Sequence, residues 1–163
     1  MSSGRSVVVL ILLLLSSACL SSQDDDQRPD YPRALVFFHR VQDSLRRNDR
    51  TEISELIEYP LLIRLHGKKH LIKTRRELLD NFNQIFDSQV RCAVIQSTDK
   101  DVWGNSHGFM VGNGAIWFDD FSPPGTNEDL QAPSFWTKGK FLMMTVNNES
   151  DYCDAKGVVL GRD

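Results

Sequence analysis

Two side chains able to exchange a proton, His107 and Asp120, lie on either side of the hairpin signal Asn113-Gly114. Asn-Gly is strongly preferred in tight hairpin turns, because both residues tolerate positive φ. A two-residue turn pairs Phe109 with Phe118 and places His107 opposite Asp120. A carboxylate beside an imidazole can orient the ring as a general acid or base. The alternative is that both side chains lie near strand ends in solvent.

Alternation along the hairpin divides its side chains between two faces. The first face is an apolar floor with a polar end, which is typical of a ligand site. We therefore expect it to bind a ligand through Asn105, His107, Phe109, Phe118 and Asp120. If the protein is an enzyme, a lyase, isomerase or hydrolase, His107 and Asp120 are the expected catalytic pair.

The second face of the hairpin carries Met110 and Trp117 among small residues. A shallow apolar surface of this kind usually marks a contact. We expect a second copy of the domain to cover it, sheet against sheet, which gives a homodimer. The C-terminal tail or the loop over residues 119–134 is the alternative cover.

Other residues that could bind or catalyse form less specific patterns than His107 and Asp120. Residues 64–76 hold Lys, Arg and His but no acid, which would suit an anionic surface, although Lys on a hairpin also blocks edge-to-edge sheet pairing. His66 and His70 flank one turn, but two ligands make a weak site, so no metal is expected. The chain lacks a nucleophile elbow, a phosphate-binding loop and a zinc-protease motif, so we expect neither a cofactor nor an established catalytic set.

Three cysteines bear on the compartment. If Cys19 is lipidated or removed, Cys92 and Cys153 remain as an even pair in an oxidising environment. A bridge between them would close a long loop and stabilise the fold. Cys92 alone is also explained as a buried small residue.

The first 18 residues have the layout of a secretory signal peptide. Arg5 precedes an unbroken apolar run from Val7 to Leu15, and small residues follow. The run is too short to span a bilayer. We therefore expect export and removal of residues 1–18.

Ser17-Ala18-Cys19 is similar to the end of a bacterial lipobox, after which the cysteine becomes the lipidated first residue. Ser16 stands where that pattern has leucine, so ordinary cleavage after Ala18 is the alternative. Residues 19–31 are polar and are expected to form a solvated tether. We expect a lipoprotein of the periplasm or outer membrane, or otherwise a secreted protein. Its membrane contact is then only the lipid anchor or the signal peptide.

Composition excludes some classes of protein. The chain has 163 residues, 40% apolar and 25% charged, with a net charge of −3. These values describe one ordinary soluble domain. General nucleic-acid binding needs dense positive charge, so we expect no nucleic-acid partner.

The elements that must position these residues begin with three predicted helices. Apolar residues at spacings of three and four indicate the first, and a Thr74–Glu77 capping box begins the third. A hairpin is inserted between the second and third helices. The helices are expected over 32–47, over a short segment ending before Tyr59-Pro60, and from Thr74 through Phe86. The strands of the inserted hairpin are expected over Leu61–Leu65 and His70–Lys73, joined by a turn at Gly67-Lys68-Lys69.

A four-stranded meander is expected to follow. Its strands are Val90–Gln96, Val102–Val111, Ala115–Asp119 and Lys140–Asn147. The last strand has Leu142, Met144 and Val146 on one face and Phe141 and Met143 on the other. Because both faces are apolar, we expect this strand at the centre of the sheet. The whole order is α+β.

This element order resembles the nuclear transport factor 2-like superfamily, which has the cystatin-like fold. Three local signatures carry the resemblance: Tyr59-Pro60, the hairpin over 108–118, and Thr145-Val146-Asn147. They are similar to a group of exported bacterial proteins of unassigned function. The resemblance implies a cone-shaped domain over 32–147, with helices wrapped on a strongly bent antiparallel sheet, followed by a tail over 148–163.

The resemblance leaves the function open, because members include both enzymes and non-catalytic binding domains. No superfamily catalytic set can be placed on this chain. We expect an exported, non-enzymatic binding domain for a protein, a glycan or a small apolar ligand, with an envelope protein or glycan as partner. The alternative is a small enzyme that uses His107 and Asp120.

Overall fold

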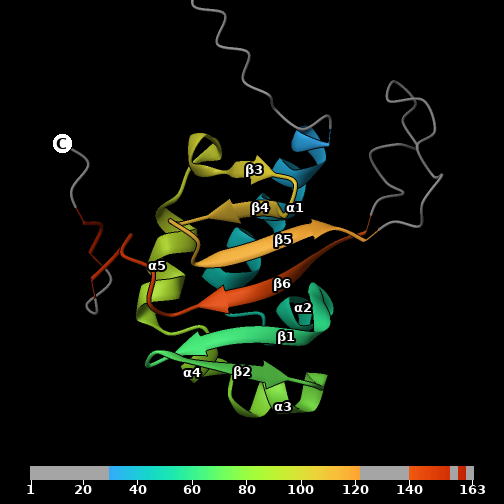
Figure 1. Cartoon of the computed structure of the whole chain (residues 1–163), viewed down its shortest axis with the longest axis vertical. Helices are drawn as coiled ribbons and strands as arrows, with labels where there is room; N and C mark the ends of the chain where they lie inside the picture. Colours follow the sequence, from blue (N-terminus) through green and yellow to red (C-terminus); the bar gives the residue numbers. More distant parts are fainter. Residues whose placement is uncertain (1–29, 122–139, 155–157, 161–163) are drawn as a thin grey trace, which may run out of the picture.

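The structure of the chain is a computed structural model that describes residues 30–121, 140–154 and 158–160. These residues form an α+β fold with one six-stranded sheet (Figure 1). The helices are α1 (Tyr31–Arg46), α2 (Arg50–Glu55), α3 (Arg75–Asp80), α4 (Phe82–Ile85), α5 (Ser88–Gln96) and the 3-10 helix η1 (Asp99–Asp101). The strands are β1 (Ile57–Leu65), β2 (Lys68–Ile72), β3 (Trp103–Asn105), β4 (Gly108–Val111), β5 (Ile116–Asp120) and β6 (Phe141–Asn147).

The strand order across the sheet is β2-β1-β6-β5-β4-β3. All neighbours are antiparallel except β1 and β6, which run parallel. In Figure 1 the helices lie behind or below the sheet, and the other sheet face looks toward the viewer. We call the face against the helices the inner face and the opposite one the outer face. None of the helices in the described part is long and apolar enough to cross a membrane.

The first predicted helix corresponds to α1, which buries Phe38, Val41 and Leu45 at the expected spacing. The second, α2, is shorter than predicted. Asp49 caps its start by accepting a hydrogen bond from the Glu52 N–H at 3.0 Å. The chain then turns into β1, so Tyr59-Pro60, joined by a cis peptide bond, lies within a strand.

Proline cannot donate to a sheet ladder, which fits a position where the ladder is irregular. The pairing of β1 with β6 skips from Ile57 to Leu62, and Pro60 lies in that gap. The Tyr59 hydroxyl donates to the Ser54 carbonyl. Burial raises the pKa of this hydroxyl, against an opposing effect of the Arg75 charge.

The β1–β2 hairpin turns one residue earlier than predicted. Its turn residues are His66 and Gly67, with φ of 49° and 71°, and Lys68 and Lys69 already belong to β2. Two successive left-handed residues give a turn whose twist matches that of the strands. The following helix starts as predicted, because Thr74 accepts from the Glu77 N–H. It breaks at Asn81, which separates α3 from α4.

The prediction of a strand over Val90–Gln96 is wrong, because these residues lie in helix α5. Asp87 caps this helix by accepting from the Val90 N–H at 3.0 Å. The buried residues Val90, Ala93 and Val94 recur at spacings of three and four, which is a helical pattern. A short apolar run fits either structure, and the cap and the helical contacts decide it here.

Arg91 holds α5 against the first half of the fold. Its guanidinium donates to the carbonyls of Phe86 and Leu45 and to the Asn48 side chain. Burial lowers the pKa of Arg91, and the nearby charge of Arg50 lowers it further.

The prediction of one strand over Val102–Val111 is also wrong. The segment contains two strands, β3 and β4, and Ser106 and His107 form the turn between them. The Asn105 side chain accepts from the His107 N–H at 2.8 Å, and this local bond favours a turn over an extended chain. The meander therefore consists of β3, β4, β5 and β6 rather than the four predicted segments.

The hairpin of β4 and β5 has the predicted register. Phe109 pairs with Phe118, and Met110 pairs with Trp117. Asn113 and Gly114 both have positive φ in the turn.

Strand β6 is central, between β1 and β5. Its predicted division of side chains is wrong, because the register jumps from Phe118 opposite Met143 to Trp117 opposite Thr145. Met144 is the extra residue of a bulge, and a bulge resets the alternation. Val146 therefore joins Met143 in the core instead of lying on the opposite face.

Candidate functional site

The inner face of the β4–β5 hairpin is filled. Phe109 and Phe118, two of the predicted ligand-binding residues, have no exposed surface. Their rings stack with centroids 5.7 Å apart, and Phe37 of α1 lies 4.9 Å from Phe118. Phe141 completes the aromatic group. Neither of the two predicted phenylalanines therefore offers surface to a ligand.

The polar end of the inner face is occupied by a side chain of α1. The Arg33 guanidinium binds the Asp120 carboxylate at 2.8 Å and lies over the Phe141 ring, 5.2 Å from its centroid. Both partners of this ion pair are largely shielded, with side chains 8% and 16% exposed. Asp120 therefore acts in the structure as the partner of a buried cation.

His107 makes no hydrogen bond or ion pair with Asp120 in the described part of the chain. It is exposed in the turn between β3 and β4, beyond the last ladder pair of β4 with β5, which joins Phe109 to Phe118. Its backbone N–H is bonded to the side chain of Asn105, which is half-buried at the end of β3. The structure brings Asn105 and His107 together through a turn, and brings Phe109 and Phe118 together in the core.

The outer face carries a row of residues that are direct ladder partners across all six strands. In strand order from the β3 edge to the β2 edge, this outer row is Trp103, Met110, Trp117, Thr145, Leu62 and Leu71. Ladder partners point to the same face of a sheet. Five of the six side chains are apolar, and none is charged. Trp103 and Leu71, at the two ends, are each about half exposed, at 50% and 51%.

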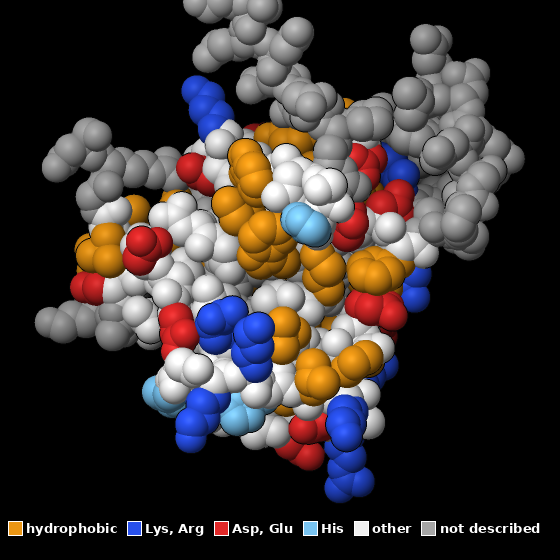
Figure 2. Space-filling view, in the orientation of Figure 1, with side chains coloured by type: hydrophobic (Ala, Val, Ile, Leu, Met, Phe, Trp, Pro, Cys, Tyr) orange, Lys and Arg blue, Asp and Glu red, His pale blue; other side chains and the backbone are white. Residues whose placement is uncertain are grey.

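Figure 2 shows this face. Hydrophobic side chains form a broad group over β3, β4 and β5 and a smaller group over β1 and β2, with Lys and Arg side chains beside the smaller group. A hollow of about 280 Å³ lies next to Trp117 and is bordered by Arg64, Thr145, Asn147 and Glu149. A depression with one aromatic wall and several polar walls can accept a projecting side chain of a partner.

Met110 and Trp117 were the predicted interface residues, and both lie half-buried on this face. Trp103, Leu62 and Leu71 were missed. Trp103 could have been found only by splitting the segment 102–111 at the Asn105-Ser106-His107-Gly108 turn signal, since the register of β3 depends on that turn. Leu62 and Leu71 depend on the parallel pairing of β1 with β6, for which the sequence gives no signal.

The basic residues of the segment 64–76 are divided between the β1–β2 hairpin and α3. Arg64 and Lys69 are ladder partners on the outer face. Arg75 instead binds Glu55 at 3.3 Å, and Arg76 lies 3.9 Å from Asp80. His66 and His70 both border a second hollow beneath the hairpin, and in the described part of the chain no group of three metal-ligating side chains could hold an ion.

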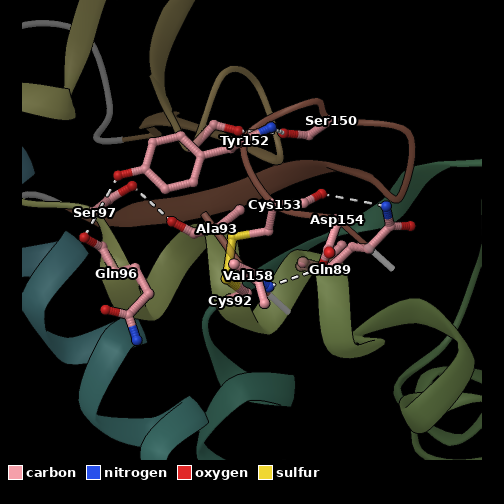
Figure 3. Close-up of a disulfide and its surroundings, with 12 residues drawn as sticks. Gln89, Cys92, Ala93, Gln96, Ser97, Ser150, Tyr152, Cys153, Asp154 and Val158 are labelled. Carbon is pink, nitrogen blue, oxygen red and sulfur yellow. Dashed lines mark hydrogen bonds between the residues drawn. A yellow bond between two sulfur atoms is a disulfide. The ribbon is translucent and has the colours of Figure 1, made fainter. Parts of the chain in front are cut away.

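Cys92 of α5 and Cys153 form a disulfide, drawn in Figure 3. They belong to a small second core with Ala93, Ala115 and Tyr152. The Gln89 side chain donates to the Cys153 carbonyl, and the Tyr152 hydroxyl lies within 3.5 Å of the Gln96 carbonyl. The segment after β6, which the sequence left unassigned, is thus fastened to α5.

Several predictions concern residues outside the described part of the chain. These are the signal peptide over 1–18, the lipidation of Cys19, the tether up to residue 29 and most of the loop over 119–134.

Comparison of the chain with models of protein families, with curated proteins and with solved structures gives no match.

Proposed function

We propose that this chain is an exported, non-enzymatic binding domain that recognises a second copy of itself through the outer row. The observation that carries the proposal is the unbroken run of ladder partners from Trp103 to Leu71, which has no charged member. Partly exposed apolar side chains that gather on one sheet face mark an interaction site. A two-fold arrangement lays one outer row against the other, so that apolar side chains meet apolar side chains in both copies.

The filled inner face favours binding over catalysis. A catalytic cone needs space for substrate beside its acid and base, whereas here the aromatic group around Phe118 occupies the floor and Arg33 engages Asp120. The outer face, in contrast, offers partly exposed surface and a hollow beside Trp117.

We assign the fold to the nuclear transport factor 2-like superfamily as part of this proposal. The assignment is supported by two helices, a hairpin and further helices that precede the meander of β3 to β6, and by a sheet that carries its helices against one face. Dimers formed through the sheet are what the resemblance implies.

Replacement of Trp117 by aspartate tests the proposed dimer. We expect the wild-type protein to have the mass of a dimer by light scattering at micromolar concentration. Trp117→Asp should be a monomer, because a carboxylate buried at an apolar interface is strongly unfavourable. The matched control is Val36→Asp on α1, which replaces another exposed apolar residue, 62% exposed, away from the sheet. That variant should remain dimeric, and a monomeric wild-type protein would overturn the proposal.

Export is supported by the order of charge, apolar run and small residues in 1–20, together with the Cys92–Cys153 disulfide. Disulfides persist mainly in oxidising compartments. We propose that lipid on Cys19 then anchors the domain.

Substitution of Cys19 tests the anchor in a bacterial host. We expect the wild-type protein in the membrane fraction and at least tenfold more of Cys19→Ser in the soluble fraction, because the serine cannot carry the thioether-linked lipid. Intact mass spectrometry should show the added lipid on the wild-type protein alone. Equal partition of both proteins would contradict the anchor.

A further inference from the structure

The hollow beside Trp117 lies where two rows of ladder partners run side by side on the outer face. Trp117 pairs with Thr145 in one row, and Asn147 pairs with Arg64 in the next. Residues two apart in a strand point to the same face, so both rows line the hollow. Glu149, which follows β6, lines it as well.

The hollow brings a cation and an anion near each other without an ion pair. Arg64 and Glu149 both line it, but no salt bridge in the described part of the chain includes either of them. One oxygen of Glu149 accepts from the Gly67 N–H, and that bond leaves the second oxygen unused. The hollow therefore presents both a charged donor and a charged acceptor.

Three neutral side chains of the hollow also have unused donors. The Asn147 side-chain oxygen accepts from the Glu149 N–H at 3.1 Å, but its amide nitrogen has no acceptor among the described residues. Within the same residues, neither the Thr145 hydroxyl nor the Trp117 indole N–H forms a hydrogen bond. A Cβ atom on Gly114 would lie 3.2 Å from the indole nitrogen, so a side chain at 114 would crowd this edge of the ring.

A sugar ring matches this set of groups. Each sugar hydroxyl both donates and accepts, so one ring can engage Arg64 and Glu149 together through charge-assisted hydrogen bonds. Its C–H groups form an apolar face, which packs on the negatively polarised face of an indole. The volume of the hollow, about 280 Å³, lies just below the range of sites for drug-sized ligands. The hollow therefore suits a ligand of one ring.

Simple ions match the hollow less well. A cation would engage only Glu149, an anion would engage only the donors around Arg64, and both would leave the indole face unused. A zwitterionic amino acid would match both charges, but its one carboxylate would be taken by Arg64, and the neutral donors would stay unused.

From these groups we propose that the hollow beside Trp117 binds one neutral, six-membered sugar ring. The ring packs on the indole, and its hydroxyl groups accept from Arg64 and donate to Glu149. Trp117 and Thr145 belong to both the hollow and the outer row, so a bound sugar and a second copy of the chain exclude each other. The sugar site itself does not depend on the proposed dimer, and only this competition rests on it.

Calorimetric titration of the purified protein tests the site with glucose, galactose, mannose and N-acetylglucosamine at millimolar concentrations, and with alanine as the zwitterionic probe. We expect saturable binding of at least one sugar. Arg64→Gln should bind that sugar about tenfold more weakly, because the variant loses a charged donor. Absence of saturable binding of all four sugars, with or without binding of alanine, would overturn the proposal.

The matched control is Lys69→Gln. Lys69 is the ladder partner of Arg64 on the same face, and it does not line the hollow. This variant loses the same charge and should keep wild-type affinity. An equal loss in Lys69→Gln and Arg64→Gln would show only a general effect of charge and would overturn the sugar site.

Light scattering with the sugar at a saturating concentration tests the competition. The mass of the wild-type protein should fall from that of a dimer to that of a monomer, whereas Arg64→Gln should stay dimeric at the same concentration. A wild-type dimer that persists with sugar bound would overturn the competition. A wild-type protein that is monomeric without sugar but binds it would overturn the dimer and support the sugar site.

Discussion

Replacement of both Cys92 and Cys153 by serine is expected to lower the free energy of unfolding by about 4 kcal/mol. The two residues are 61 positions apart, and a cross-link that closes a loop of this length removes much of the conformational entropy of the unfolded chain, by about 4 kcal/mol in the chain-entropy model. Urea denaturation followed by tryptophan fluorescence measures the change, which should appear as a lower midpoint.

The control for this prediction is the third cysteine. Cys19→Ser should leave the unfolding midpoint unchanged, since the bridge joins the other two. A reducing agent should lower the midpoint of the wild-type protein and of Cys19→Ser, but it should have no effect on the double serine variant. A double variant within about 1 kcal/mol of the wild type would show that the bridge adds little to the folded state.

The parts of the fold that were predictable from the sequence are those set by local signals. The apolar spacing around Phe38 indicated α1, and Thr74 with Glu77 indicated the start of α3. Asn113-Gly114 set the register that pairs Met110 with Trp117. In each case a few neighbouring residues determine the backbone, and the rest of the fold agrees with them.

The errors have different causes. Residues 90–96 form a short apolar run that fits a strand or a helix, and the local signals that mark the helix are the Asp87 cap and the spacing of its buried residues. Met144 forms a bulge, and no local pattern marks it, so the faces of β6 were assigned incorrectly beyond that point. The pairing of β1 with β6 joins segments about eighty residues apart.

The candidate sites also divide into those set by local signals and those set by distant contacts. Met110 and Trp117 were predictable as a surface because one hairpin holds both. The ion pair of Arg33 with Asp120 was not, because it joins α1 to the end of β5. The cavity beside the disulfide was not predictable either, since its walls come from the β1–β2 turn, α5 and the segment after β6, which meet only in the folded chain.

The place where α5 and the segment after β6 meet depends on close packing between the β4–β5 turn and α5. Gly112 has a φ of 61°, and a Cβ atom there would lie 2.8 Å from the Cβ of Ala93 and 3.1 Å from its backbone. The Ser150 hydroxyl donates to the Gly112 carbonyl, which ties the segment after β6 to the same turn. Ala93 is next to Cys92 in the chain, so the glycine and the disulfide belong to one junction.

Gly112→Ala is therefore expected to lower the free energy of unfolding by about 3 kcal/mol. The left-handed backbone costs an alanine about 1 kcal/mol, and the contact with Ala93 adds about 2 kcal/mol because neither backbone can move away easily. The change is measured by urea denaturation under the conditions used for the cysteine variants.

Gly67→Ala separates the two contributions. Gly67 has a similar φ of 71°, but a Cβ atom there would meet nothing within 4 Å. Its substitution should lower the free energy of unfolding by only about 1 kcal/mol, since the backbone term alone applies. Equal losses at Gly67 and Gly112 would mean that the turn and α5 are not closely packed. A larger loss at Gly112 would confirm that the contact with Ala93 adds to the cost of the left-handed backbone.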